Sequence, residues 1–315
     1  MSSRHWTAAA IPDLAGRTAV VTGANAGIGF EIARVLAARG ALVVLACRDC
    51  GKAQRAAARI AASDHHARTA VVRLDLASLA SIREAGDEIR ATYSRVDLLI
   101  NNAGVMELPY ERTVDGFELT FATNHLGHFA LTGLVLDRLL ETPGSRVVTM
   151  SSMGHEPGVM NFDDLQSEHD YKPAEAYYQS KLTNLLFTYE LDRRLRVAGA
   201  PTQALAAHPG VVYTDLFRTR SRLDRALLSP WLRPINFWAV QNVHKGALPV
   251  LRAATDPAAR GGEYYGPHRK HDTGYPVAVE SSARSHDLAD QARLWHVSER
   301  LTGVEYAVTV PPVLP

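Results

Sequence analysis

Tyr177 and Lys181 are the two residues of this sequence best suited to move a proton. They stand four positions apart within a helical pattern, so their side chains share one helix face, one turn apart. A tyrosine hydroxyl has an ordinary pKa of about 10, and a cation beside it eases release of the proton. The pair can therefore act as a general acid or base. The same spacing also occurs on exposed helix surfaces, so the rest of the chain must discriminate between the two.

A glycine-rich stretch could bind a phosphate-containing cofactor. In "VVTGANAGIGFEIA" (20–33), Gly23, Gly27 and Gly29 stand between an apolar run and a helical pattern. A parallel α/β sheet binds a dinucleotide at this kind of position. Glycine permits the turn, lets a pyrophosphate approach the backbone, and leaves the helix N-terminus free to meet negative charge. The spacing differs from the common G-x-G-x-x-G fingerprint, so a plain structural turn is the alternative.

The elements that would position these residues alternate between short apolar runs and longer helical patterns. This alternation is typical of repeated βαβ units and a parallel sheet, and the continuous apolar character indicates strands covered on both faces. The expected strands are 18–22, 41–46, 69–74, 96–100, 145–150, 202–207 and 262–266. The expected helices are 27–39, 52–62, 78–92, 114–140, 174–197, 243–254 and 284–301. Several residues from Asp75 to Ser81 are candidate N-caps of the third helix, and Ser81 with Glu84 has the spacing of a capping box.

No repeat or linker divides the chain, so we expect one domain over residues 1–315. Its cofactor-binding part would span about 15–208, a substrate lid about 209–245, and a C-terminal packing segment about 246–315. Residues 213–242 mix arginines with aromatic residues and prolines. Such an insertion fits a lid, a partner surface or an interfacial anchor, and the lid is our expectation.

Composition excludes several classes of partner. Hydrophobic residues make up 46% and charged residues 21% of the 315, as in ordinary globular proteins. A formal net charge of +1 gives no electrostatic reason to expect nucleic acid as a partner. No segment reaches the roughly 18 apolar residues of a membrane span, and a signal-peptide core is missing, so a cytoplasmic location is expected. Cys47 and Cys50 form a C-x-x-C without a second such pair, and we expect two unpaired thiols rather than a redox or zinc site.

Five features occur in the order and spacing of one family: "TGANAGIG" (22–29), "NNAG" (101–104), Ser152, "YYQSK" (177–181) and "HPG" (208–210). Over roughly residues 15–270 the chain resembles the short-chain dehydrogenase/reductase family. Three further segments resemble its retinol-dehydrogenase-like branch: "ACRD" (46–49), "TNHLGHF" (123–129) and "SKLTNLLF" (180–187). The resemblance implies a single α/β domain with a Rossmann-type, doubly wound parallel sheet of about seven strands and helices on both faces.

The resemblance also implies a catalytic set of Asn124, Ser152, Tyr177 and Lys181. Ser152 would orient the substrate oxygen and stabilise the charge that develops on it. The family pattern selects this second serine of the pair rather than the first. Tyr177, not its neighbour Tyr178, has the four-residue step to Lys181.

Asn124 matches the asparagine that related enzymes use to hold a water between the lysine and solvent. An asparagine inside a helix can instead relieve a bend. His125 and His128 flank it, but no further metal ligands accompany them. We interpret both histidines as packing or polar helix residues and expect no metal.

Cofactor choice is expected to depend on Arg48, at the end of the second strand. A carboxylate there bonds the ribose 2′-hydroxyl of NAD(H), whereas a guanidinium suits the 2′-phosphate of NADP(H). Arg48 precedes Asp49, with Lys52 four residues on. The sequence therefore favours NADP(H). NAD(H) held by Asp49, with Arg48 solvated, is the alternative.

Other cofactor contacts follow from the resemblance. Asp75 would bond the adenine amino group, or cap the third helix instead. The "NNAG" segment would line the ribose and pyrophosphate, or pack the sheet. Val211 and Thr214 would bond the carboxamide. The implied cofactor-binding set is Gly23, Asn25, Gly27, Ile28, Gly29, Arg48, Asp75, Leu76, Asn102, Ala103, Gly104, Tyr177, Lys181, Pro209, Gly210, Val211 and Thr214.

The activity implied is NADP(H)-dependent interconversion of a carbonyl compound and an alcohol by hydride transfer, with Tyr177 as general acid/base. The substrate would be an apolar small molecule, a ketone, aldehyde or alcohol, and a homodimer is possible. The aromatic residues of 213–242 suggest a bulky substrate, and the arginines of that segment leave an acidic group possible. A cofactor-binding sensor or scaffold on the same fold is the main alternative, although such proteins typically lose the tyrosine or lysine. A light-dependent tetrapyrrole reductase shares several motifs, but its serine position and reactive cysteine insertion have no match here.

Overall fold

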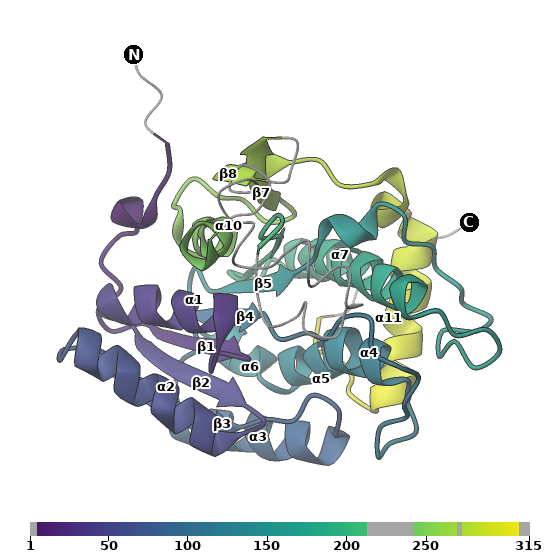
Figure 1. Cartoon of the computed structure of the whole chain (residues 1–315), viewed down its shortest axis with the longest axis horizontal. Helices are drawn as coiled ribbons and strands as arrows, with labels where there is room; N and C mark the ends of the chain where they lie inside the picture. Colours follow the sequence, from purple (N-terminus) through teal and green to yellow (C-terminus); the bar gives the residue numbers. More distant parts are fainter. Residues whose placement is uncertain (1–4, 213–241, 270–272, 309–315) are drawn as a thin grey trace, which may run out of the picture.

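The computed structural model describes residues 5–212, 242–269 and 273–308. An eight-stranded sheet forms its centre, in the order β3-β2-β1-β4-β5-β6-β7-β8 (Figure 1). The strands are β1 (Thr18–Thr22), β2 (Leu42–Cys47), β3 (Arg68–Arg73), β4 (Leu98–Asn101), β5 (Arg146–Met150), β6 (Gln203–Ala207), β7 (Tyr264–Arg269) and β8 (Thr273–Val279). Strands β1 to β7 pair in parallel, and β8 pairs antiparallel to β7.

The strand order reverses beside β1, which pairs with β2 on one side and with β4 on the other. Ligands of open α/β sheets bind at such a reversal, beyond the carboxyl ends of the strands. Val21 lies opposite Ile100 in the β1–β4 register. The chain that leaves β1 therefore meets the chain that leaves β4.

Helices cover both faces of the sheet. One face carries α1 (Gly27–Ala38), α2 (Cys50–Ser63) and α10 (Val243–Thr255). The other carries α3 (Leu79–Thr92), α5 (Gly127–Leu134), α6 (Leu136–Leu140) and α7 (Pro173–Val197), with α11 (Leu288–Thr302) packed against α5 and α7. Shorter elements are α4 (Leu119–Phe121), the π-helical turn η2 (Ala122–Leu126), and the 3-10 turns η1 (Ala8–Ala10), η3 (Met153–His155) and η6 (Ala283–His286).

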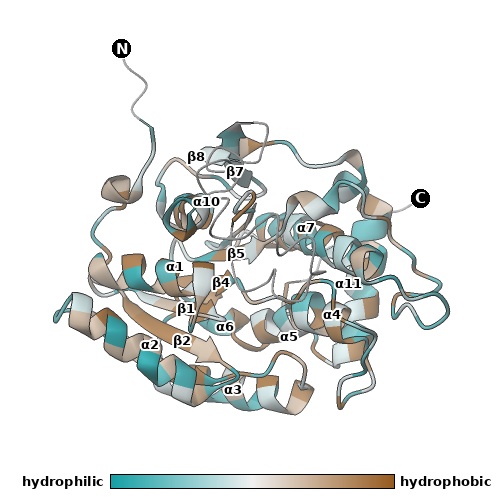
Figure 2. Cartoon of the chain, viewed as in Figure 1, coloured by the Kyte–Doolittle hydropathy of each residue, from teal (hydrophilic) through white to brown (hydrophobic). Residues whose placement is uncertain are grey.

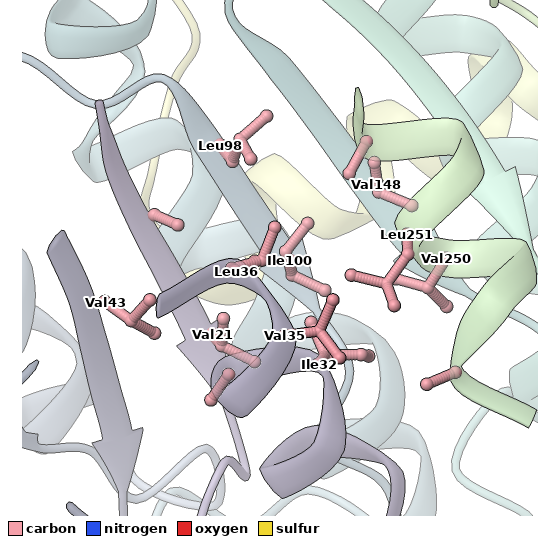
Figure 3. Close-up of a cluster of buried hydrophobic side chains, with 14 of the residues drawn as sticks. Val21, Ile32, Val35, Leu36, Val43, Leu98, Ile100, Val148, Val250 and Leu251 are labelled. Carbon is pink, nitrogen blue, oxygen red and sulfur yellow. The ribbon is translucent and has the colours of Figure 1, made fainter. Parts of the chain in front are cut away.

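The hydrophobic core lies in two layers, one on each face of the sheet. Figure 3 shows the first layer, where Ile32 of α1 and Leu251 of α10 point at strand residues such as Val21 and Ile100. In Figure 2 the central strands are mostly brown, whereas hydrophilic and hydrophobic residues alternate along α2. This burial of both faces explains why the strands are continuously apolar in sequence.

The expected α/β fold is confirmed, with one strand more than expected. β8 lies at the edge of the sheet and contains Gly274 and Pro276. Proline cannot complete a ladder on both sides, so it is found at sheet edges, where a continuous apolar run is not required. The sequence signal of this edge strand is correspondingly weak.

The expectation of one helix over 114–140 is wrong. Helical structure begins at Leu119, where the Glu118 carboxylate accepts hydrogen bonds from the Thr120 and Phe121 amides. The helix then widens into the π turn η2 and breaks at Val135, between α5 and α6. A 3.6-residue pattern does not distinguish an α-helix from a single π turn.

The capping box of Ser81 and Glu84 is also wrong. Ser78 is the N-cap of α3, and its hydroxyl accepts from the Ser81 amide at 3.3 Å. The Ser81 hydroxyl lies inside the helix and accepts instead from the Asp75 amide at 3.0 Å. The helix begins three residues earlier than the box requires because an alternative cap was available.

The described part of the C-terminal segment packs on the core. The rings of Trp295 and Tyr306 contact Phe129 and Phe187. The Tyr306 hydroxyl donates to the Phe129 carbonyl at 2.6 Å. This segment is therefore part of the fold, whereas its role in dimer formation stays a prediction.

Most of the expected lid, residues 213–241, lies outside the described residues. The division of the chain into three functional parts stays a prediction. Within 5–212, 242–269 and 273–308, no helix is both long and apolar enough to cross a bilayer.

Candidate active site

The glycine turn between β1 and α1 lies tightly against the segment that follows β4. Gly23 (φ 66°) and Gly27 (φ 56°) adopt left-handed conformations that favour glycine. At Gly29 the constraint is space, because an added Cβ would stand 2.5 Å from both the Gly23 carbonyl oxygen and Asn102 Nδ2. The unequal glycine spacing thus satisfies two backbone conformations and one close packing contact.

We expect Gly29→Ala to lower the free energy of unfolding by about 1–3 kcal/mol, because the new methyl group overpacks this turn. Gly51→Ala in α2 is the matched control, since its Cβ would meet its nearest neighbour, Asp49 Oδ1, at an ordinary 3.4 Å. That control is expected to be neutral or stabilising by less than about 1 kcal/mol. Urea denaturation of the two variants measures both changes, and equal stability of the two would contradict the packing argument.

The N-terminus of α1 suits an anionic ligand. Its N-cap, Ala26, provides no side-chain hydrogen bond to the first turn. By contrast, a side chain caps each of α2, α3, α10 and α11: Asp49, Ser78, Asn242 and Asp287. Amides in the first turn of α1 are thus left for a ligand, and the adjacent backbone turn has no bulky side chain. The site therefore fits a dinucleotide pyrophosphate.

The "NNAG" segment is held by the end of β1. The Thr22 hydroxyl accepts hydrogen bonds from the Asn102 and Ala103 amides, both at 2.9 Å, and Asn102 Nδ2 donates to the Thr22 carbonyl at 2.8 Å. Asn101 is buried and donates to Thr132 Oγ1 at 3.1 Å. Asn101 therefore packs the sheet, while Asn102 and Ala103 lie against the glycine turn.

Arg48 lies exposed at the carboxyl end of β2. Its neighbour Asp49 is the N-cap of α2, where one carboxylate oxygen accepts from the Lys52 amide at 2.9 Å and the other lies 3.6 Å from Lys52 Nζ. Hydrogen bonding by that amide lowers the pKa of the Asp49 carboxyl. Asp49 thus has a structural role that the sequence interpretation did not assign to it.

Asp75 is half-buried after β3, and its carboxylate accepts from the Ala77 amide at 3.1 Å. It shapes the turn before α3 but does not cap that helix, which has Ser78 as its N-cap. The adjacent Leu76 is buried, and its carbonyl oxygen would lie 2.5 Å from a Cβ at Gly127. Close packing against α5 therefore positions Leu76 and, with it, the neighbouring Asp75.

Asn124 is fully buried in the π turn η2, and its side chain forms hydrogen bonds with both backbone groups of Val105. Its Oδ1 accepts from the Val105 amide at 2.8 Å, and its Nδ2 donates to the Val105 carbonyl and to Ser180 Oγ, both at 2.9 Å. A Cβ at Gly104 would stand 3.1 Å from Asn124 Oδ1 and 3.5 Å from Lys181 Nζ. The asparagine side chain thus fixes the backbone beside the lysine.

The two serines after β5 have different environments. The Ser151 hydroxyl is buried and donates to the Lys181 carbonyl at 2.8 Å. The Ser152 hydroxyl is half-buried and accepts from the Gly154 amide at 3.1 Å in the turn η3. His155 Nδ1 lies 2.6 Å from the Ser152 carbonyl oxygen. Ser151 therefore ties α7 to the sheet, and Ser152 is the serine with some solvent access.

Tyr177 and Lys181 lie on the face of α7 that meets the carboxyl end of β5. A Cβ at Gly154 would touch the Tyr177 ring at 3.0 Å, which places that ring against the Ser152 turn. Lys181 Nζ lies 5.6 Å from the centroid of this ring and donates to the Met150 carbonyl at 3.3 Å. Burial lowers the pKa of Lys181 to about 8. The pair is therefore inside the protein rather than on an exposed helix face.

The chain after β6 turns at Gly210, which has a φ of 68° and donates its amide to His208 Nδ1 at 3.3 Å. Pro209 and Val211 complete this turn, and Val212 is buried against α10. Thr214 lies outside the described residues, so its predicted bond to the carboxamide stays a prediction.

Cys47 and Cys50 are both free thiols. Burial raises the pKa of Cys47 to about 11, although backbone hydrogen bonds from Ala24 and Asn25 oppose this shift. The protonated Cys47 thus supports the glycine turn from β2. Among the residues that the structure describes, no group of three His, Cys, Asp or Glu side chains could hold a metal ion.

Three polar side chains form hydrogen bonds with residues of the site, although the sequence predicted no role for them: Thr22, Ser180 and Asn184. Asn184 Nδ2 donates to the Met150 carbonyl at 2.9 Å, the same acceptor that Lys181 uses. All three occur inside the quoted motifs. Small polar residues within such buried elements were the available signal, but their partners are distant in sequence.

The chain is similar in sequence to known proteins. Residues 17–224 match the profile of the short chain dehydrogenase family. The chain is 42% identical over 293 residues to Retinol dehydrogenase 12 of Mus musculus, covering 92% of this chain and 88% of that protein. It is also 42% identical over 295 residues to Retinol dehydrogenase 13 of Homo sapiens, covering 92% and 86%.

Solved structures give the same result. A crystal structure of an uncharacterized protein from Mycobacterium Paratuberculosis has a TM-score of 0.79 and 44% identity, covering 96% of this chain and 99% of that one. A structure from Beutenbergia cavernae, assigned as an NAD(P) dependent gluconate 5-dehydrogenase with bound NADP, has a TM-score of 0.64 and 27% identity, covering 80% and 95%. The protein therefore belongs to the short-chain dehydrogenase/reductase family of oxidoreductases, and its sequence is retinol-dehydrogenase-like.

Proposed function

We propose that this protein is an NADP(H)-dependent oxidoreductase that interconverts a ketone or aldehyde and its alcohol, with Tyr177 as the general acid/base. The observation that carries the proposal is the position of Tyr177. Its ring packs against the Ser152 turn, and Lys181 Nζ lies 5.6 Å from the ring centroid. The Ser152 hydroxyl, the Tyr177 acid/base and the Lys181 cation thus lie together at the carboxyl edge of the sheet.

These residues have distinct roles in the proposed reaction. A bound nicotinamide cofactor supplies or accepts the hydride. Ser152 Oγ orients the substrate oxygen and stabilises the negative charge that forms on it. Tyr177 Oη gives that oxygen a proton during reduction and takes one during oxidation. The ammonium of Lys181 favours the phenolate form of Tyr177 after the proton has left.

The glycine turn, the uncapped N-terminus of α1 and the "NNAG" segment would hold the cofactor. The preference for the 2′-phosphorylated form rests on Arg48 and on the structural role of Asp49. Because the Asp49 carboxylate is engaged by Lys52, it is poorly available to a ribose hydroxyl. The Arg48 guanidinium is exposed at the same strand end and can bind a phosphate in a bidentate manner.

We expect Arg48→Ala to weaken NADPH binding roughly 10- to 100-fold, which corresponds to the loss of a hydrogen bond to a charged group. NADH binding is expected to change little. Arg90→Ala is the control, because this exposed arginine in the last turn of α3 lies toward the amino edge of the sheet. Fluorescence titration measures both affinities. Unchanged NADPH affinity in Arg48→Ala would refute the phosphate role.

The substrate is proposed to be apolar. The relatives named retinol dehydrogenases make retinol and retinal reasonable first compounds, alongside a panel of aliphatic and aromatic aldehydes and ketones. Cofactor absorbance reports turnover. Tight NADPH binding with no turnover on any of these compounds, and no effect of Tyr177→Phe in cells, would favour the sensor or scaffold instead.

A cytoplasmic location and a homodimer stay predictions. Cell fractionation tests the first. Light scattering on the purified chain tests the second, and it should be run with and without cofactor because binding at a subunit interface shifts the oligomer equilibrium.

A further inference from the structure

His128 is a buried histidine one helical turn after Asn124. It is 1% exposed, and both of its ring nitrogens have partners. Nε2 lies 2.9 Å from Thr22 Oγ1, and Nδ1 lies 3.1 Å from the Asn124 carbonyl oxygen. The imidazole therefore stands between the end of β1 and the π turn that carries Asn124.

The direction of these two hydrogen bonds follows from Thr22. A hydroxyl has two acceptor sites and one proton. Both acceptor sites are filled by the amides of Asn102 and Ala103. The Thr22 proton must therefore be donated, and His128 Nε2 at 2.9 Å is a closer acceptor than the Ile100 carbonyl at 3.4 Å. His128 Nε2 thus accepts, and the ring proton resides on Nδ1, which donates to Asn124.

Two further features favour this neutral tautomer. Burial lowers the pKa of His128 to about 4, and the charge of Lys181 acts in the same direction. A protonated ring would also place a second donor against the Thr22 hydroxyl, which has no acceptor site left. At neutral pH, His128 is consequently a fixed donor–acceptor bridge.

The bridge completes a ring of hydrogen bonds around the backbone of residues 102–105. Thr22 holds Asn102 and Ala103, and the Asn124 side chain holds Val105 through both its oxygen and its nitrogen. His128 joins the two halves by linking Thr22 to the Asn124 backbone. The backbone enclosed by this ring includes Gly104, which packs beside Lys181 Nζ.

We infer that His128 is a positioning residue for the reaction: by linking Thr22 to the Asn124 backbone, it fixes the position of Asn124 and so keeps Gly104 beside Lys181. The inference rests on the proposed function, because it concerns the same site. His128 touches neither substrate nor cofactor in this role. Its effect on turnover passes through Asn124.

His125 provides the contrast. It is equally buried but lies in the π turn η2 itself, next to Asn124, and burial lowers its pKa to about 3. Its Nε2, however, lies 2.8 Å from Ser298 Oγ on α11, away from the end of β1. Replacing either histidine disturbs packing, but only His128 connects Thr22 with Asn124.

The kinetic experiment compares His128→Leu, His128→Asn and His128→Gln with the control His125→Gln. Leucine removes both bonds, asparagine retains a donor near the Nδ1 position, and glutamine retains an acceptor near Nε2. We expect His128→Leu to lower kcat about 10- to 100-fold with a smaller change in KM, as misplacement of catalytic groups does. His128→Asn should recover part of kcat, and His125→Gln should retain most of it at comparable thermal stability.

Thr22→Val and Thr22→Ser test the other end of the bridge. Thr22→Val should reproduce the loss of kcat, and Thr22→Ser should restore it. The double variant Thr22→Val with His128→Leu should lose little more than either single variant. Equal loss of stability in the His125 and His128 variants, with kcat retained in both, would show a packing role only and overturn the inference.

A readout independent of turnover is the tautomer of His128 in wild-type protein. Long-range ¹H–¹⁵N correlation spectra distinguish Nδ1–H from Nε2–H, and the His128→Asn spectrum identifies the signal. The Nδ1–H form is expected, and the Nε2–H form would overturn the bridge even if a variant failed to fold. By contrast, wild-type protein with the Nδ1–H tautomer but no turnover would contradict the proposed function and leave the bridge supported.

Discussion

Replacing Tyr177 with phenylalanine is expected to lower kcat by about 10²- to 10⁴-fold, the usual contribution of a positioned general acid or base. Phenylalanine keeps the ring that packs against Gly154 and removes only the hydroxyl. The fold should therefore change little, and the effect on NADPH affinity should be far smaller than the effect on kcat. Steady-state turnover by cofactor absorbance, together with fluorescence titration of NADPH, separates these effects.

Tyr178→Phe is the matched control. This neighbouring tyrosine is half-buried, and its ring centroid lies 6.3 Å from that of Tyr177. It lacks the four-residue step to Lys181, so kcat should stay close to the wild-type value. Loss of activity in Tyr178→Phe, with activity retained in Tyr177→Phe, would show that the acid/base was assigned to the wrong tyrosine.

Lys181→Met is expected to lower turnover by a similar factor and yet to stabilise the folded apoprotein. Turnover falls because no cation remains near Tyr177 to favour the phenolate. Stability rises because an ammonium that is 4% exposed is replaced by an apolar side chain of similar length. The variant therefore separates the function of this lysine from its cost to the fold.

The sign of the pH dependence follows from the pKa shift. Burial lowers the pKa of Lys181 from 10.5 to about 8. Between these values the unfolded chain binds more protons than the folded one, so this group makes stability rise as pH increases. Below pH 8 the full penalty applies, at most about 3 kcal/mol. The stability gain of Lys181→Met should be greatest near neutral pH and vanish as pH approaches 10.5.

Urea denaturation of wild type and variant between neutral and alkaline pH measures this difference, because all other titrating groups are shared. Lys172→Met is the control, since this exposed lysine before α7 pairs with Asp170 and Glu175, which raise its pKa. It should not stabilise the protein. A gain for Lys181→Met that is constant across this range would refute the buried-charge explanation.

The parallel strands of this fold were predictable because both of their faces are buried. Residues 18–22 form β1 as expected, and the other expected strands begin or end within a few residues of the observed ones. Strand β8 was missed because an edge strand with a proline lacks that signature. The interruption at 122–126 was missed because hydrophobic periodicity does not report a π turn.

The site was predictable to the extent that its residues lie close in sequence. Tyr177 with Lys181, and the glycines at 23, 27 and 29, are local patterns whose chemistry can be inferred from spacing. The bonds from Thr22 to Asn102, or from Asn124 to Ser180, join residues that are 80 and 56 positions apart. No local pattern indicates such pairs.

The sequence by itself therefore determined the fold class, the family and the candidate chemical groups, because these depend on periodicity and on short motifs. Only the tertiary structure decided that Asp49 caps a helix, that Ser152 rather than Ser151 has solvent access, and that His128 bridges Thr22 and Asn124. Hydrogen-bond partners and burial depend on which strand ends meet at the carboxyl edge of the sheet. That arrangement is a property of the folded chain as a whole.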